Sequence, residues 1–143
     1  MDRGFTLVEV LLSVAILTLL MGISLPVYET FVRRNDLDIS TQNIVSSLRR
    51  ASTNARAVNG DSTWGVRIQS SGLTLYKGTS YVTRDATYDE TTSIPSTIAL
   101  SGISEVTFAK LSGAPTTTGA ITLTSTTNDT RTMTVNAKGT VDY

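Results

Sequence analysis

The chain has 143 residues, enough for one compact domain and one additional element. It contains no cysteine, which excludes disulfides, thiolate metal sites, a cysteine nucleophile and a cysteine-linked lipid anchor. Histidine is also absent, and 12 basic side chains balance 12 acidic ones, so neither an enzyme nor general attraction to nucleic acid is favoured. We therefore predict a non-enzymatic protein and assign no catalytic residue, cofactor or metal ion.

One uncharged apolar run, residues 10–27, stands near the N-terminus and follows the stretch 5–9, FTLVE. A helix of about 20 residues crosses a bilayer core, so segment 5–27 is long enough to do so. A secretory signal peptide is the first interpretation, but only Arg3 is basic before the run and no convincing Ala-x-Ala site follows it. A retained membrane span is the second interpretation, and it must account for Glu9.

Glu9 places a carboxylate about one helical turn inside an apolar segment, where a charge is costly unless it is neutralised or paired. If the chain were cut after Gly4, the new α-amine on Phe5 would lie four residues away, or a neighbouring chain could offer the same amine. Such a pair of opposite charges would offset much of the cost. Alternatively, Glu9 only reaches the membrane interface, and its position alone leaves both interpretations open.

Residues 4–12, GFTLVEVLL, resemble the processing motif of type IV prepilins and type II secretion pseudopilins, and the resemblance extends to residue 27. It implies that residues 1–4 form a leader and that a membrane-embedded prepilin peptidase cuts between Gly4 and Phe5. It also implies that the Phe5 amine is methylated. Glu9 would then pair with the N-terminus of a neighbouring subunit during assembly.

The same resemblance implies a structural subunit, anchored by a single span in the inner membrane before it enters a periplasmic or extracellular filament. Its partners would be the membrane, the prepilin peptidase, an inner-membrane assembly platform and other pilin or pseudopilin subunits. Basic residues flank the span on both sides, with Arg3 before it and Arg33 and Arg34 after it. Charge alone therefore does not fix the orientation of the span in the membrane. The choice between a pilus, a secretion system and a competence system stays open.

Helical periodicity continues beyond the apolar run. Apolar residues recur at spacings of one helical face, namely Leu37, Ile44, Leu48, Ala51 and Ala55. The dipeptide Asn59-Gly60 then predicts a helix stop. We expect one helix over residues 5–58, with segment 5–27 in lipid or a filament core and the amphipathic segment 28–58 packed on a β-rich domain of residues 59–143.

Gly22 and Pro26 predict a break in this helix, because proline removes a backbone hydrogen bond and clashes with the preceding turn. In the resembled family, the helix bends or melts at this place within the filament. A simple kink with no role in assembly is the alternative interpretation.

After Gly60 the apolar pattern changes to period two, which is typical of β-strands. We predict an α+β, pilin-like fold in which the long N-terminal hydrophobic helix packs on an antiparallel β-sheet of about four to seven strands. The expected elements are a hairpin over 64–69 and 73–77, a weaker strand pair over 97–100 and 105–110, a loop over 111–119, a second hairpin over 120–125 and 130–136, and an edge strand within 138–143.

Three short β motifs resemble the minor pseudopilins of the GspH/FimT type: TWGVRI at 63–68, GAITLT at 119–124 and MTVNAKG at 133–139. This second resemblance favours a minor subunit over a major pilin. The alternative function is a binding module at a filament tip, which would capture DNA or a surface through loops 78–96 and 111–119.

The sequence contains two further groups of charged residues that could form a binding site. Asp85, Asp89 and Glu90 form an acidic cluster in an expected loop, but the chain lacks an Asp-x-Asp-x-Asp-Gly calcium loop, so a solvated loop is favoured over a cation site. From residue 59 onward, six basic residues face seven acidic ones, which disfavours DNA binding. A basic patch on the helix, formed by three arginines, could still contact DNA: Arg49, Arg50 and Arg56.

Overall fold

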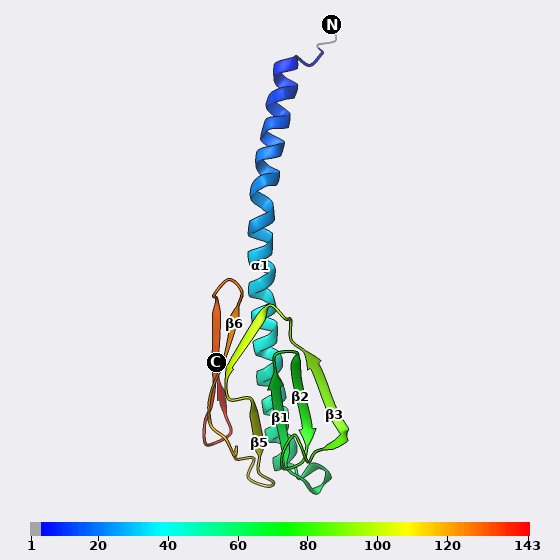
Figure 1. Ribbon diagram of the computed structural model, residues 1–143, viewed down its shortest axis with the longest axis vertical. Helices are drawn as coiled ribbons and strands as arrows, with labels where there is room; N and C mark the ends of the chain where they lie inside the picture. Colours follow the sequence, from blue (N-terminus) through cyan, green and yellow to red (C-terminus); the bar gives the residue numbers. More distant parts are fainter. Residues whose placement is uncertain (1–3) are drawn as a thin grey trace. The chain divides into compact units, whose positions relative to one another are not determined.

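The computed structural model of the protein describes residues 4–143, without the side chains of residues 23–27 (Figure 1). Residues 1–3 of the expected leader therefore lie outside the described residues. The chain divides into two compact units, Met1–Val32 and Arg33–Tyr143. Helix α1 (Leu7–Arg56) runs from the first unit into the second, and a short 3-10 turn, η1 (Asn59–Asp61), follows it.

The bounds of α1 confirm the expected helix over residues 5–58 to within two residues at each end. All five residues of the predicted apolar face, from Leu37 to Ala55, are fully buried. The helix stop differs in detail, because Val58 as well as Gly60 adopts the left-handed conformation, with φ of 54° and 65°. Helix α1 passes through Gly22 and Pro26, although the Pro26 side chain lies outside the described residues. A break there within a filament stays a prediction.

Eight described strands form two four-stranded antiparallel sheets, which flank the second half of α1 (Figure 1). The first sheet has the order β3 (Asp85–Ser93), β2 (Gly72–Lys77), β1 (Trp64–Gln69), β5 (Glu105–Phe108). The second sheet has the order β4 (Ile98–Gly102), β6 (Gly119–Ser125), β7 (Thr130–Val135), β8 (Val141–Asp142). The α+β class with an antiparallel arrangement is confirmed, but the strands form two sheets where the sequence predicted one.

Both predicted hairpins are confirmed, as β1–β2 and β6–β7, and β8 confirms the predicted edge strand in a shorter form. The predicted pairing of 97–100 with 105–110 is wrong, because β4 pairs with β6 while β5 pairs with β1. The chain crosses between the sheets directly after Gly102, whose φ of 94° favours glycine. Strand β3 was missed because it lies at an edge and its side chains are mostly exposed, so its sequence carries no apolar alternation.

One hydrophobic core joins the helix to both sheets. Its large fully buried side chains come from α1, from β1, β2 and β5, and from β6 and β7. Trp64, the sole tryptophan, is 5% exposed, and its Nε1 donates a hydrogen bond of 2.9 Å to the Asn59 carbonyl. This contact joins the start of β1 to the 3-10 turn η1.

Candidate functional site

The N-terminal motif lies at the start of α1. Gly4, Phe5 and Thr6 precede the helix without regular secondary structure, and the Glu9 amide donates to the Thr6 hydroxyl at 3.3 Å and to the Thr6 carbonyl at 3.1 Å. Threonine followed three residues later by glutamate is the capping-box pattern, and a carboxylate in the first turn also complements the helix dipole. Local sequence therefore fixes Glu9 in the first turn of α1, close to Phe5.

Apolar side chains cover all sides of this part of the helix and are uncovered in the chain. Each large apolar side chain from Phe5 to Met21 is at least 51% exposed. A helix that is apolar all round is stable only in apolar surroundings, and such a large exposed apolar surface marks a contact with a membrane or another protein. The first unit thus presents its apolar residues to something outside the chain.

The hydroxyl groups in this segment bond back to their own helix. Ser13 donates to the Glu9 carbonyl at 2.7 Å, and Thr18 donates to the carbonyls of Val14 and Ala15 at 3.0 and 2.8 Å. Such local bonds leave little unsatisfied polarity on an apolar helix. Over the described residues, no helical stretch is both long and apolar enough to cross a membrane.

Neither Gly4 nor Gly22 is needed for packing within the chain. A Cβ atom built at either position meets no atom within 4 Å, and neither backbone is in the left-handed region. A requirement for glycine at these positions would therefore have to come from a partner that recognises the segment.

The acidic cluster lies on strand β3, so its placement in a loop is wrong. Asp89 pairs with Arg84 at 2.7 Å, and Glu90 pairs with Arg50 at 2.7 Å. Adjacent strand residues point to opposite faces, which separates Asp89 from Glu90. Asp85 instead is close to Thr87, whose hydroxyl and then whose amide, which donates a hydrogen bond to Asp85, lower the pKa of Asp85. Within the described part of the chain, no three acidic side chains gather as metal ligands.

The segment before β3 belongs to the expected loop 78–96, and Glu105 forms hydrogen bonds with it. Its carboxylate accepts hydrogen bonds from the Tyr81 amide at 2.9 Å, the Tyr76 hydroxyl at 2.8 Å and Arg67 at 3.1 Å. Burial raises the pKa of Glu105, but these three donors outweigh burial and hold the pKa below its usual value. Burial also raises the pKa of Tyr76. Sequence reasoning missed Glu105. The feature that marks it is its position opposite Arg67 on the neighbouring strand, and the pairing of β1 with β5 is set by the tertiary fold.

The second expected loop, 111–119, also forms hydrogen bonds with neighbouring elements. The Leu111 amide donates to the Ala55 carbonyl at 3.0 Å, and the Thr116 amide donates to the Thr107 carbonyl at 2.8 Å. The Leu111 side chain itself is 72% exposed. The structure therefore keeps this segment against the end of α1 and the edge of β5.

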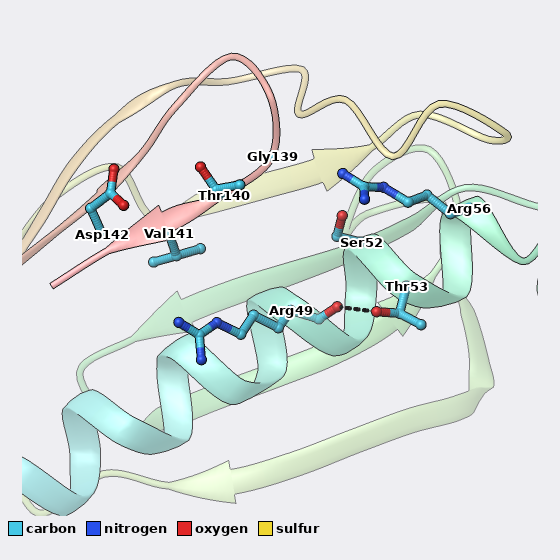
Figure 2. Close-up of a pocket in the computed structure, with 8 residues that line it drawn as sticks. All are labelled: Arg49, Ser52, Thr53, Arg56, Gly139, Thr140, Val141 and Asp142. Atoms are coloured by element: carbon cyan, nitrogen blue, oxygen red, sulfur yellow. Dashed lines mark hydrogen bonds between the residues drawn. The ribbon is translucent and has the colours of Figure 1, made fainter.

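The predicted basic patch is divided by the fold. Arg50 is paired with Glu90, whereas Arg49 and Arg56 line a cavity between α1 and the C-terminal residues (Figure 2). The three arginines therefore do not act as one cationic surface.

Comparison with known proteins gives two findings. Residues 1–25 match the prokaryotic N-terminal methylation motif. The fold is similar to that of the minor pseudopilin EpsH from the type 2 secretion system of Vibrio cholerae, with a TM-score of 0.55 over 75% of this chain and 94% of that chain, at 16% identity. The chain therefore combines an N-terminal methylation motif with a fold similar to that of a minor pseudopilin. No curated protein sequence matches it.

The two findings differ in how much of the chain they cover. The motif occupies the start of the sequence, while the structural likeness covers three quarters of the chain. Together they support the resemblance of this chain to the type IV prepilin and pseudopilin family.

Proposed function

We propose that the chain is a structural, minor-type subunit of a type II secretion pseudopilus or a type IV pilus. It is made as a single-pass precursor in the inner membrane, cut by a prepilin peptidase between Gly4 and Phe5, and methylated on Phe5. An inner-membrane platform then transfers it into a periplasmic or extracellular filament. There, α1 packs among the helices of other subunits, and the helix bends or unwinds near Gly22 and Pro26.

The observation that carries this proposal is the match of residues 1–25 to the methylation motif, at the start of a helix whose apolar side chains are uncovered. Cleavage would remove four residues and leave the amine of Phe5 two residues before the start of that helix. Bundled helices of neighbouring subunits would supply the apolar surroundings that the exposed side chains lack. The likeness to EpsH, a minor pseudopilin of a secretion system, favours the minor and secretion alternatives.

Glu9 has a defined part in this proposal. Its carboxylate is costly in an apolar filament core, and the Phe5 amine of a neighbouring subunit would neutralise it. The pairing would select a particular axial register, because only one offset between adjacent helices brings the amine to the carboxylate.

The decisive experiment is the intact mass and N-terminal sequence of the protein purified from native membranes. We expect a chain that begins at N-methylated Phe5. Gly4→Leu should leave the precursor uncut, whereas Gly4→Ala should retain part of the cleavage because alanine is nearly as small. Gly22→Leu is the matched control, because Gly22 is equally free of neighbours within 4 Å. A mature chain that still begins at Met1 would refute the prepilin assignment.

A further inference from the structure

A cavity of about 460 Å³ lies between one face of α1 and the last strand of the second sheet (Figure 2). This volume is within the usual range of binding pockets. The lining residues on α1 have the spacing of one helical face, and the opposite wall is the turn into β8 and β8 itself. They are Arg49, Ser52, Thr53, Arg56, Gly139, Thr140, Val141 and Asp142.

The two arginines of the cavity contact neutral groups. The Arg49 guanidinium lies 5.5 Å from the centre of the Tyr143 ring, and Arg56 donates to the Lys138 carbonyl at 3.2 Å. Five other arginines of the second unit have a carboxylate partner: Arg34, Arg50, Arg67, Arg84 and Arg131. A guanidinium has five N–H donors, so both cavity arginines keep donors for an anion.

The hydroxyl groups of the cavity are already engaged. Thr53 donates to the Arg49 carbonyl at 2.9 Å (Figure 2), and Ser52 donates to the Gly113 carbonyl at 3.3 Å. Asp142 contributes one negative charge to the wall. The cavity therefore contains two guanidinium groups and one carboxylate. This combination suits a ligand with a few localised negative charges.

Strand β8 contributes both of its residues, Val141 and Asp142, to the wall of the cavity. It is the terminal strand of its sheet, and the Asn136 amide donates to the Thr140 carbonyl at 3.1 Å. Bonded and non-bonded pairs alternate along an antiparallel ladder, so the next pair, Val135 with Val141, is non-bonded. The N–H and C=O of Val141 therefore point away from β7, toward the open edge, and Val141 lines the cavity.

We propose that this cavity binds an extended acidic segment of a partner protein, which adds a strand to the edge of β8. Main-chain bonds to Val141 would set the register of the segment, and its carboxylates would meet Arg49 and Arg56. A nucleic acid would supply anions but no strand-forming backbone, and it would also meet Asp142. This binding role goes beyond the proposed function, since it involves neither the cleavage motif nor the apolar part of α1.

The test uses the detergent-solubilised full chain and a fluorescent heptapeptide, TEVEVET, whose glutamates share one face of a strand. We expect anisotropy titrations to show binding, and each of Arg49→Gln and Arg56→Gln to weaken it by about tenfold, the loss typical of a charged hydrogen bond. Arg50→Gln is the matched control, because Arg50 is an adjacent exposed helix residue that pairs with Glu90 outside the cavity. Trp64 fluorescence confirms that each variant is folded.

Three further probes separate the parts of the proposal. The peptide TQVQVQT should bind at least about tenfold more weakly, since it lacks the charges. A TEVEVET peptide N-methylated at alternate residues should also lose binding, because it cannot form a ladder. A short oligothymidylate should bind more weakly than TEVEVET. Absence of TEVEVET binding, equal binding of the modified peptides, tighter binding of the oligonucleotide, or an equal effect of Arg50→Gln would each overturn the proposal. None of these measurements depends on cleavage or filament assembly, so the proposed function is tested separately.

Discussion

The two units of the chain use apolar residues in opposite ways. In the first unit, the large apolar side chains from Phe5 to Met21 are at least half exposed, and the side-chain hydrogen bonds of Thr6, Ser13 and Thr18 reach no farther than four residues. In the second unit, apolar side chains form a shared core, and polar contacts join residues as far apart as Arg34 and Asp129. The first unit thus presents its apolar side chains for contacts outside the chain, whereas the second unit buries its apolar side chains in a core of its own. Each prediction below tests this contrast, from the largest expected effect to the smallest.

Glu9→Gln tests the part of the first unit that assembly would use. We expect membrane insertion and cleavage to persist while filament formation is lost, because the amide cannot neutralise the Phe5 amine of a neighbour. Glutamine still satisfies the capping-box pattern, so the start of the helix should be retained. Sedimentation of sheared filaments, followed by immunoblotting, measures the loss.

Glu29→Gln, which changes the next acidic residue along α1, provides the control for Glu9→Gln. Filaments should form with this control variant. Normal filaments with Glu9→Gln would show that the charge of Glu9 is dispensable, and the capping role would then suffice to explain the residue.

Leu48→Ala tests the second unit, where Leu48 is fully buried in the core. We expect the free energy of unfolding to fall by about 3 kcal/mol, from lost burial and the cavity left behind. The matched change Leu12→Ala removes a leucine that is 61% exposed, and it should alter the free energy by less than about 0.5 kcal/mol.

Urea unfolding of the detergent-solubilised chain, followed by Trp64 fluorescence, checks both leucine variants, because the sole tryptophan lies in the second unit. A comparable loss for Leu12→Ala would mean that the first unit supports the fold of the second. The contrast between the units would then fail.

The contrast also explains which features could be predicted from sequence. Capping, apolar runs and hairpins depend on near neighbours, so the helix, both hairpins and the face from Leu37 to Ala55 were predicted correctly. Features set by distant contacts were not. Strand β3 has no apolar alternation in its sequence, and the assignment of β4 and β5 to different sheets depends on partners far along the chain.

The candidate sites follow the same division. Thr6 and Glu9 form a local motif that can be recognised by spacing alone. The separation of Arg50 from Arg49 depends on Glu90, forty residues away, so sequence reasoning treated the arginines as one patch. No local pattern marks Glu105 as the residue that fixes the segment around Tyr81.

Glu105→Gln tests a polar contact that only the second unit can make. We expect a loss of about 1–3 kcal/mol in the free energy of unfolding at neutral pH, because Glu105 accepts three hydrogen bonds at a half-buried position. Its pKa is lowered in the folded state, so its charge-dependent stabilisation is present above the usual value of 4.5 and is lost as pH falls through the lower folded pKa.

The difference in unfolding free energy between wild type and Glu105→Gln should therefore shrink below pH 4.5. Urea unfolding at a series of pH values measures it, with Glu90→Gln as control because the Glu90–Arg50 pair is more than half exposed on both sides. That control should change the free energy by about 0.5 kcal/mol or less. A difference for Glu105→Gln that stays constant with pH would assign the effect to packing.

The smallest effect concerns exposed leucines, which occur in both units but under different backbone constraints. Leu111 is 72% exposed and has φ of 71°, a conformation that costs a residue with a Cβ about 1–2 kcal/mol. Leu111→Gly removes that cost from the folded state. Glycine also raises the conformational entropy of the unfolded chain, which opposes folding, so we expect a net stabilisation of about 0.5 kcal/mol. Leu111→Ala keeps the Cβ and should be nearly neutral.

In the first unit, Leu11→Gly should instead reduce helix content, because Leu11 lies inside a regular helix where glycine is unfavourable. Urea unfolding measures the free energy of unfolding of the two Leu111 variants, and far-ultraviolet circular dichroism measures the helix content of Leu11→Gly. If Leu111→Ala stabilised the chain as much as Leu111→Gly, the backbone conformation at this position would not be the cause, and exposure of the leucine side chain would be.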